Sequence, residues 1–302
     1  GTRMNLAPSI SPNGEYLVYI SEESLFSIDL FLADARTGER LKKLTSTASE
    51  AHFNALRFID SAGSWSPDGE QFVFVVFNKG RNELAFLDVE SRDITRQVRI
   101  RGVEEITNPA WSPDGNRIVF SGITGGQSDL FLHDLTTGET ERLTNDRYAD
   151  MQPAWAPDGQ SIAFTTDRGP ATDFDRLTYG SMQIAVMDMN DRSIRRLNLF
   201  ANGKHIDPKY SPDGRSLYFV SNHDGFSDIY RVSLATRQIY RVTRIATGVH
   251  GITDMSPVLS VSRQTGRMLL TVFEEGAYNI HALAAGEIRG QRAHGGGEGL
   301  LA

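Results

Sequence analysis

A short turn motif that recurs along the whole chain constrains the fold more than any other feature of this sequence. Five copies read Ser-Pro-Asp-Gly or a close variant and end at Gly14, Gly69, Gly115, Gly159 and Gly214. A sixth, degenerate copy is Ser262–Gly266, with the sequence SRQTG. Successive glycines are 55, 46, 44, 55 and 52 residues apart. A repeat of this period indicates an array in which each copy is one supersecondary unit.

The chemistry of the motif predicts a hairpin in each copy. Proline sets the second position of a type I turn, aspartate tolerates the third, and glycine adopts the left-handed conformation that follows. Runs after the turn, such as Arg117–Ser121 and Ser216–Ser221, alternate and are rich in β-branched and aromatic residues, which predicts strands. A third run, such as Asp129–Leu132, and a fourth that closes at Leu143-Thr144 complete each repeat. Each repeat is therefore predicted to be four antiparallel strands.

Six such units predict an all-β fold, a six-bladed β-propeller of four-stranded antiparallel blades. All prolines but Pro170 fall in the turn or at the start of the first strand, where no ladder donor is needed. We predict a single propeller over residues 1–292 and a flexible glycine-rich tail or linker over 293–302. The fourth strand of blade six is weak near 287–292, so the N-terminal residues are an alternative source for it.

Composition limits the partners that this chain could have. The formal net charge is −7 and the pI is about 5.5, which argues against nucleic acid because phosphate contacts need clustered Lys and Arg. The longest apolar run, Phe72–Phe77, is far short of the ~20 residues of a membrane-spanning helix. The absence of cysteine excludes disulfides and thiolate chemistry but does not identify a compartment.

The segments PAWSPDG (109–115) and PAWAPDG (153–159) resemble the blade motif of TolB-type propellers, and the resemblance extends over residues 5–283. The same motif occurs in the propellers of prolyl-oligopeptidase-like peptidases and of some sugar lyases. The resemblance implies a periplasmic or extracytoplasmic protein that is a monomer or part of a larger chain. It also implies a protein or peptide partner, such as a cell-envelope lipoprotein. TolB carries an α/β domain before its propeller, and none precedes Asn5, so we expect a TolB-like module.

Two long connections are the first candidate binding site. They span residues 50–63, between blades one and two, and residues 167–181, between strands two and three of blade four. Both belong to the face that carries the strand-two to strand-three loops and the blade-to-blade loops, and long loops on a rigid scaffold commonly carry recognition. Phe58, Phe174 and Tyr179 are the candidate contact residues. The alternative is that these apolar side chains only pack the loops down.

The second candidate binding site is formed by the residue that stands, in each of the six repeats, three positions before the start of the first strand; we call these six residues the sequence column. It comprises Asn5, Asp60, Ile106, Asp150, His205 and Asp254, and the five polar members are predicted to converge near the channel mouth. Oxygen ligands of this kind would suit Ca²⁺, and the carboxylates would equally suit an amine or guanidinium. The alternative is that each residue caps its own loop. His52 and His250 lie in similar loops to His205 but lack a tight transition-metal pattern.

No catalytic motif is present. The sequence lacks the G-x-S-x-G elbow, the H-E-x-x-H motif and the phosphate-binding G-x-x-x-x-G-K-[ST]. The sequence therefore favours a non-catalytic scaffold that binds a protein or peptide through the long-loop face and the axial mouth. Two alternatives stay open: a substrate-filtering propeller of a larger peptidase, and a propeller lyase or hydrolase that acts on sugars.

Overall fold

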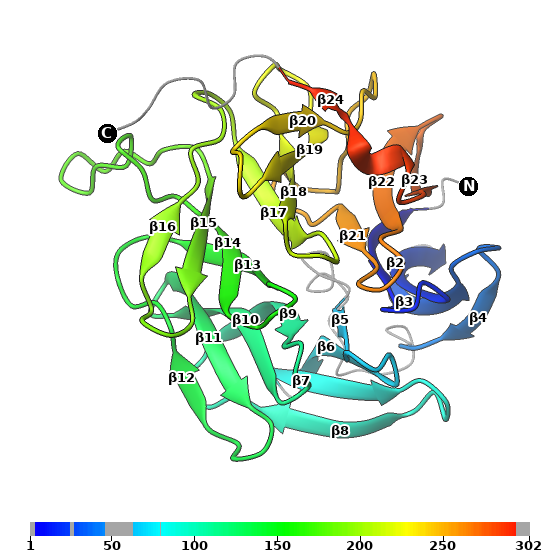
Figure 1. Cartoon of the computed structure of the whole chain (residues 1–302). Helices are drawn as coiled ribbons and strands as arrows, with labels where there is room; N and C mark the ends of the chain where they lie inside the picture. The colour runs from blue at the N-terminus through cyan, green and yellow to red at the C-terminus, as the bar shows by residue number, and fades with distance from the viewer. Residues whose placement is uncertain (1–3, 25–26, 46–62, 79, 294–302) are drawn as a thin grey trace.

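The computed structural model describes residues 4–24, 27–45, 63–78 and 80–293. Six antiparallel sheets surround a central axis, and the first strand of each lies innermost (Figure 1). These inner strands are β1 (Asn5–Ile10), β5 (Ser64–Trp65), β9 (Glu105–Trp111), β13 (Asp150–Trp155), β17 (His205–Tyr210) and β21 (Leu259–Val261). The six-bladed propeller prediction is confirmed. No helix among the described residues is long and apolar enough to span a bilayer.

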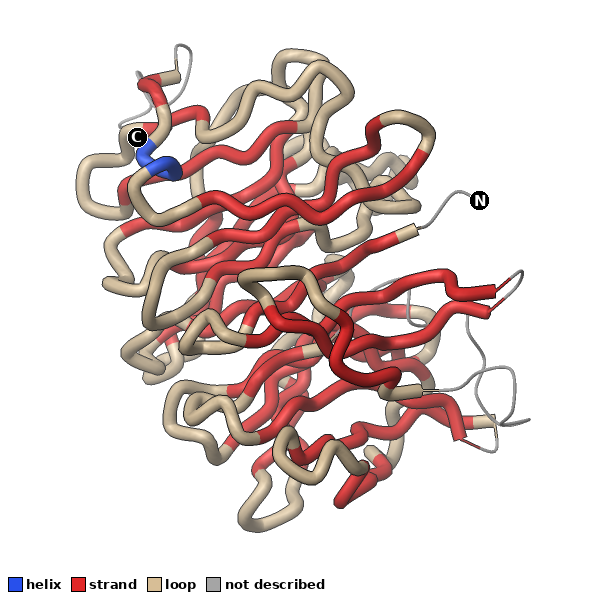
Figure 2. Tube along the Cα trace, turned by 90° about the vertical axis from the view of Figure 1, so that its right-hand side faces the viewer, coloured by secondary structure: helices blue, strands red, loops and turns tan. Residues whose placement is uncertain are grey.

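The other strands follow outward in chain order within each blade. Second strands are β2 (Tyr16–Ser24), β6 (Gln71–Asn78), β10 (Arg117–Thr124), β14 (Ser161–Thr166), β18 (Ser216–Ser221) and β22 (Met268–Glu274). Third strands are β3 (Ser27–Asp34), β7 (Arg81–Asp88), β11 (Gln127–Asp134), β15 (Gln183–Asp188), β19 (Asp228–Ser233) and β23 (Ala277–Leu283). Fourth strands are β4 (Arg40–Lys43), β8 (Ile94–Arg99), β12 (Thr140–Arg142), β16 (Ile194–Arg196) and β20 (Ile239–Arg241). Strands run between two faces on which the loops gather (Figure 2).

The repeated tetrad forms the turn between the first and second strands, as its chemistry predicts. In blade three, the Ser112 hydroxyl donates to the Asp114 carboxylate at 2.5 Å and accepts from the Arg117 amide at 2.9 Å. Gly115 has a φ of +78°, and the glycines of all six copies, Gly266 included, lie between +67° and +79°. The degenerate copy is thus a true turn. We call the face that carries these turns the turn face, and the opposite one the loop face.

A second repeated device ties the third strand to the fourth. Asp129 is fully buried at the start of the third strand of blade three, where its carboxylate accepts from the Thr144 hydroxyl at 3.2 Å and pairs with Arg142. Thr144 in turn accepts from the Leu130 amide at 2.9 Å. The same arrangement recurs as Asp228, Arg241 and Thr243 in blade five and as Asp29, Lys43 and Thr45 in blade one.

The hydrophobic core is divided among the interfaces between neighbouring blades. Six clusters of buried apolar side chains each draw on two adjacent blades, and one of them joins blade one to blade six through Ile10, Phe31 and Leu269. Backbone contacts reinforce this junction, because the Ile10 amide donates to Ser260 Oγ at 3.0 Å and Ser262 Oγ donates to the Pro12 carbonyl at 2.7 Å. The ring is therefore closed by packing between sheets.

Blade six departs from the predicted four strands. Its sheet has three strands among the described residues, β21, β22 and β23. The segment near 287–292, expected as its fourth strand, instead forms a 3-10 turn (Glu287–Arg289) and the short strand β24 (Gln291–Arg292), which pairs with β20 of blade five. Burial of Ile288 in the cluster between blades five and six holds the segment there. Among the described residues, the N-terminal side pairs with β23 through a single bridge between Met4 and Tyr278.

Candidate functional site

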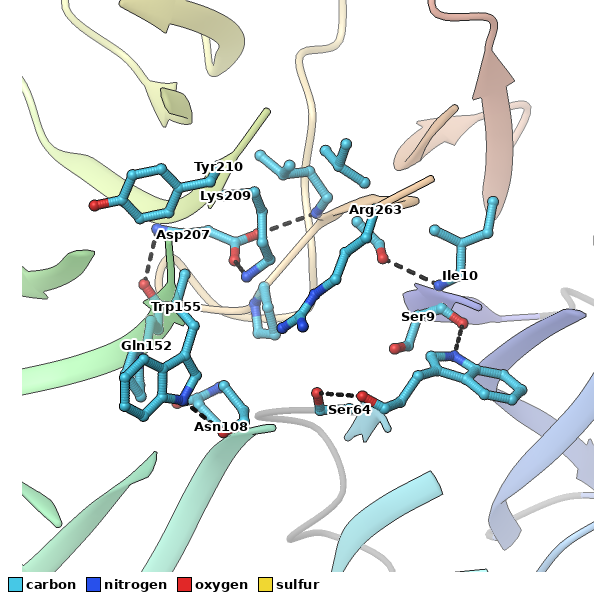
Figure 3. Close-up of a pocket in the computed structure, with 18 of the residues that line it drawn as sticks. Ser9, Ile10, Ser64, Asn108, Gln152, Trp155, Asp207, Lys209, Tyr210 and Arg263 are labelled. Atoms are coloured by element: carbon cyan, nitrogen blue, oxygen red, sulfur yellow. Dashed lines mark hydrogen bonds and ion pairs between the residues drawn. The ribbon is translucent and has the colours of Figure 1, made fainter. Parts of the chain in front are cut away.

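A channel along the axis is the first of two cavities that we describe. It has a volume of about 160 Å³ and receives residues from the innermost strands or turns of all six blades. Its charged lining residues are Asp207, Lys209 and Arg263. Figure 3 shows these side chains directed toward the space between the blades. We call this cavity the axial channel.

A strained backbone position shapes the channel wall. Ala7, Asn108, Gln152 and Asp207 each precede a proline of the first strand and have φ values of 47°, 49°, 54° and 54°. In each case the pairing with the second strand shifts register at this point. Left-handed φ is unfavourable for residues with a Cβ, so the bulge is held by its surroundings. Bulges re-aim side chains, and here they direct Gln152 and Asp207 to the seam between blades.

Gln152 and Asp207 link blades four, five and six. The Gln152 side-chain oxygen accepts from the Asp207 amide at 3.0 Å and from Thr165 Oγ1 at 2.8 Å, while its Nε2 donates to the Met255 carbonyl at 2.6 Å.

Asp207 extends this network into blade six. Its Oδ2 accepts from the amides of Val258 and Leu259 at 2.9 and 3.0 Å, and its Oδ1 pairs with Lys209 Nζ at 2.6 Å. A buried carboxylate with this many donors is well compensated. Sequence reasoning missed this position, although one signal was available: the residue before the first-strand proline is polar in several copies.

The loop face carries the exposed apolar side chains. Among the described residues, five large hydrophobic side chains are exposed, and all belong to strand-two to strand-three connections, to the end of a second strand, or to a blade-to-blade loop. They are Leu177 (69%), Tyr179 (65%), Phe226 (54%), Phe273 (40%) and Ile252 (38%). None of these five lies on the turn face. Clustering of exposed apolar groups on one face is a feature of interaction surfaces.

The long connection of blade four, residues 167–182, holds two of the exposed apolar side chains, Leu177 and Tyr179, outward. Asp173 and Thr178 pair through two backbone hydrogen bonds of 2.9 and 3.0 Å, so the segment ends in a small hairpin. Leu177 lies at its tip with a φ of +53°. Phe174 instead packs against Tyr148, with ring centroids 5.0 Å apart, and lies under the Arg147 guanidinium. Phe174 therefore anchors the loop, while Tyr179 stands exposed beside it.

The second cavity opens on the loop face between blades five and six. It has a volume of about 430 Å³ and is lined in part by Lys204, His250, Ile252, Asp254 and Phe273. Lys204 Nζ lies 3.4 Å from the Asp254 carboxylate at its edge. We call this cavity the loop-face pocket; it combines an ion pair with two of the exposed apolar side chains.

The structure does not bring the described members of the sequence column together in either cavity. Asn5 accepts from Ser21 Oγ at 2.9 Å, Asp150 from Thr166 Oγ1 at 2.6 Å, and the His205 ring lies 3.0 Å from Ser221 Oγ. Each is thus bonded to the second strand of its own blade, and Ile106 is buried in the core. Asp254 alone among these described members borders a cavity.

Several predicted positions fall on a segment that the structure does not describe. Asp60, Phe58, His52 and most of the 50–63 connection lie outside the described residues. In the described part of the chain, no group of three or more His, Cys, Asp or Glu side chains is arranged to hold a metal ion. The Ca²⁺ site at the axial mouth stays a prediction.

Burial controls the charge of two members of this column. It raises the pKa of Asp150 to about 6 even though Arg168 Nη2 lies 2.6 Å from the carboxylate and favours its ionised form. Burial lowers the pKa of His205 to about 4, so its imidazole is neutral at pH 7. Neither side chain has any exposed surface. In this geometry neither side chain lines the axial channel.

Comparison with known proteins agrees with the architecture. Residues 60–174 match the family model of the TolB beta propeller domain. The crystal structure of TolB from Acinetobacter baumannii aligns with 98% of this chain at 21% identity and a TM-score of 0.65. The chain has the TolB-like six-bladed β-propeller fold. This TolB-like propeller covers 64% of the A. baumannii chain, so it spans less than two thirds of that protein.

Two further solved structures share the fold of the TolB-like propeller. A TolB-type protein from Agrobacterium tumefaciens shares 18% identity over 97% of this chain and 89% of its own, with a TM-score of 0.64. An oligogalacturonate lyase from Vibrio parahaemolyticus shares 15% identity over 96% of this chain and 78% of its own, with a TM-score of 0.59. No curated protein sequence matches this chain. At these identities the comparisons establish the fold alone.

Proposed function

We propose that this TolB-like propeller is a non-catalytic scaffold that binds an extracytoplasmic protein or peptide through its loop face. One observation carries the proposal: the five exposed large hydrophobic side chains of the described residues all lie on that face. Burying a fully exposed side chain of this size is worth about 1.5–3 kcal/mol, and a partner would recover the part of this that corresponds to the surface still exposed on each of the five.

The geometry of blade four supports recognition there. Leucine at a left-handed φ costs free energy, and exposing it to water forgoes any gain from burial. A hairpin that fixes Leu177 outward, braced by the packing of Phe174 against Tyr148, reduces the entropy lost on binding. The loop-face pocket supplies a neighbouring recess for an apolar group beside the Lys204–Asp254 pair.

The same proposal includes a periplasmic location and a cell-envelope lipoprotein as the partner class. Both are suggested by the likeness to TolB structures. The peptidase-filter and sugar-lyase alternatives rest on likeness of fold, which unrelated activities share. No described residue favours either of them.

Site-specific photocrosslinking tests the proposal with the partner still unidentified. A photoreactive phenylalanine analogue replaces Tyr179 or Phe226 on the loop face, and Arg36 or Asp191 on the turn face serves as the matched exposed control. We expect a discrete adduct in envelope extracts from the first pair only. The adduct partner is then purified, and Leu177→Ser with Tyr179→Ser is expected to weaken its binding about tenfold or more. Adducts from the turn face, or unchanged affinity of the double variant, would count against the proposal.

A further inference from the structure

The degenerate turn of blade six places an arginine where the other five copies have a proline. Those prolines are Pro12, Pro67, Pro113, Pro157 and Pro212, and the corresponding residue of the sixth copy is Arg263. Neighbouring turns lie side by side around the axis: a Cβ placed on Gly69 would be 3.6 Å from Pro12, and one on Gly214 would be 3.5 Å from Pro157. Pro12, Pro157, Pro212 and Arg263 all line the axial channel. The arginine therefore interrupts a proline rim at the turn-face mouth.

The side chain of Arg263 crosses the channel. Its Nη2 donates to the carbonyl of Trp111 at 2.8 Å, and Trp111 belongs to blade three, on the opposite side of the ring. Figure 3 shows the guanidinium extending into the middle of the channel. This single hydrogen bond uses one of five N–H donors. None of its nitrogens is among the fully buried unpaired atoms, so the guanidinium keeps N–H donors that the protein does not fully enclose.

No carboxylate neutralises this cation among the described residues. Asp207 is the carboxylate that lines the channel, and it is already paired with Lys209 and with two backbone amides. Burial lowers the pKa of Arg263, and no nearby charge offsets this effect. Arginine remains protonated at any physiological pH, so the channel carries a net positive charge within a chain of net charge −7. A partly buried, unpaired guanidinium is costly unless an anion joins it.

We propose that the axial channel binds the carboxylate group of a small organic anion, with Arg263 as its principal ligand. A planar guanidinium matches a planar carboxylate through two parallel hydrogen bonds. Ser260 lines the same channel; its hydroxyl accepts from the Ile10 amide and keeps its proton free to donate. Proline rings and Trp155 supply apolar walls for the hydrocarbon part of the ligand. The volume of about 160 Å³ limits the bound group to a small one.

This site is independent of the proposed partner surface. Arg263 and the prolines beside it belong to the turns of the turn face, whereas the exposed apolar side chains lie on the loop face. Failure of either proposal leaves the other standing.

Calorimetric titration and thermal unfolding of the full chain test the site. Acetate, succinate, sulfate and chloride are compared at equal ionic strength, together with a tripeptide that has a free or an amidated C-terminus. We expect saturable stabilisation by carboxylates that sulfate and chloride do not reproduce. Binding of succinate would identify a free acid as the source, whereas binding of the unblocked tripeptide alone would identify a chain terminus.

Three variants connect the binding to the guanidinium. Arg263→Gln is expected to weaken carboxylate binding about 10- to 100-fold. Arg263→Lys keeps the charge but loses the planar guanidinium, so its affinity for carboxylates should lie between those of the wild type and Arg263→Gln. Arg215→Gln removes an exposed arginine from the neighbouring turn and is expected to bind as the wild type does. If Arg263→Gln does not fold, the Nε–H resonance of Arg263 in the wild-type protein must shift on titration with acetate. Equal binding by the wild type and Arg263→Gln, no shift of that resonance, or a stronger response to sulfate would overturn the proposal.

Discussion

At the scale of single residues, burial sets the charge of side chains that look functional in the sequence. His205 and Asp150 are both fully buried, and their pKa values move in opposite directions for the same reason: each is held toward its neutral form. A histidine whose folded pKa is about 4, against an unfolded value of 6.5, binds fewer protons in the folded state. The contribution of this neutral histidine to the free energy of unfolding is therefore complete above pH 6.5 and is lost as the pH falls toward 4.

The first prediction follows from this linkage. When the pH falls from 7.5 to 4.5, the free energy of unfolding of the wild-type protein should decrease by roughly 2–3 kcal/mol more than that of His205→Gln. Urea unfolding of both proteins at the two pH values measures the difference. Asp150 has the opposite pH dependence, but it is present in both proteins and cancels in the comparison. A stability difference that does not change with pH would show that His205 is not held neutral.

At the scale of the element, the turn tetrad works through backbone geometry. Gly115 has a φ of +78°, and a Cβ there would meet nothing closer than Pro67 at 3.8 Å. Space is therefore available, and the requirement for glycine is conformational. Proline rigidity and the Ser112–Asp114 hydrogen bond complete the turn.

We expect Gly115→Ala to destabilise the protein by about 1–2 kcal/mol because alanine is strained at this φ. Gly286→Ala is the matched control: Gly286 has a φ of −71°, and a Cβ added there would meet nothing within 4 Å, so its effect should stay within about 0.5 kcal/mol. Midpoints of urea unfolding with unchanged slopes report both values. Equal effects of the two substitutions would contradict a conformational role for the turn glycine.

At the scale of the whole molecule, the ring depends on contacts between blades rather than on a shared strand. Six apolar clusters occupy the six seams, and polar links such as Asp207 add directional bonds between blades five and six. Since each blade packs on two neighbours, loss of one seam should weaken all of them.

Asp207→Ala tests this cooperativity. It removes the acceptor of two backbone amides and leaves Lys209 unpaired, so we expect a loss of about 3–5 kcal/mol. The three tryptophans lie in blades two, three and four, away from that seam. Their fluorescence should nevertheless report the same lowered midpoint as far-UV circular dichroism. Asp191→Ala, at an exposed turn, serves as the control. An unchanged fluorescence midpoint in Asp207→Ala would indicate blades that unfold separately.

The repeat, the turns and the number of blades could be predicted from the amino-acid order because they depend on local chemistry. Proline and glycine set φ within four residues, and alternation sets which side chains are buried. The long connection of blade four and its exposed Tyr179 were located in the same way. The direction of first-strand side chains depends instead on packing between blades. A bulge before the proline turns Asp207 toward the seam, whereas Asp150 and His205 turn to the second strand of their own blades.

The closing segment and the channel also depend on contacts between distant parts of the chain. Residues near 287–292 join blade five because Ile288 finds a buried site there, among side chains far away in the sequence. In the linear sequence, Arg263 is distinguished only by its place in the degenerate sixth copy of the turn motif. Only the ring brings it across the axis to Trp111, because a closed toroid makes neighbours of residues that are about 150 positions apart.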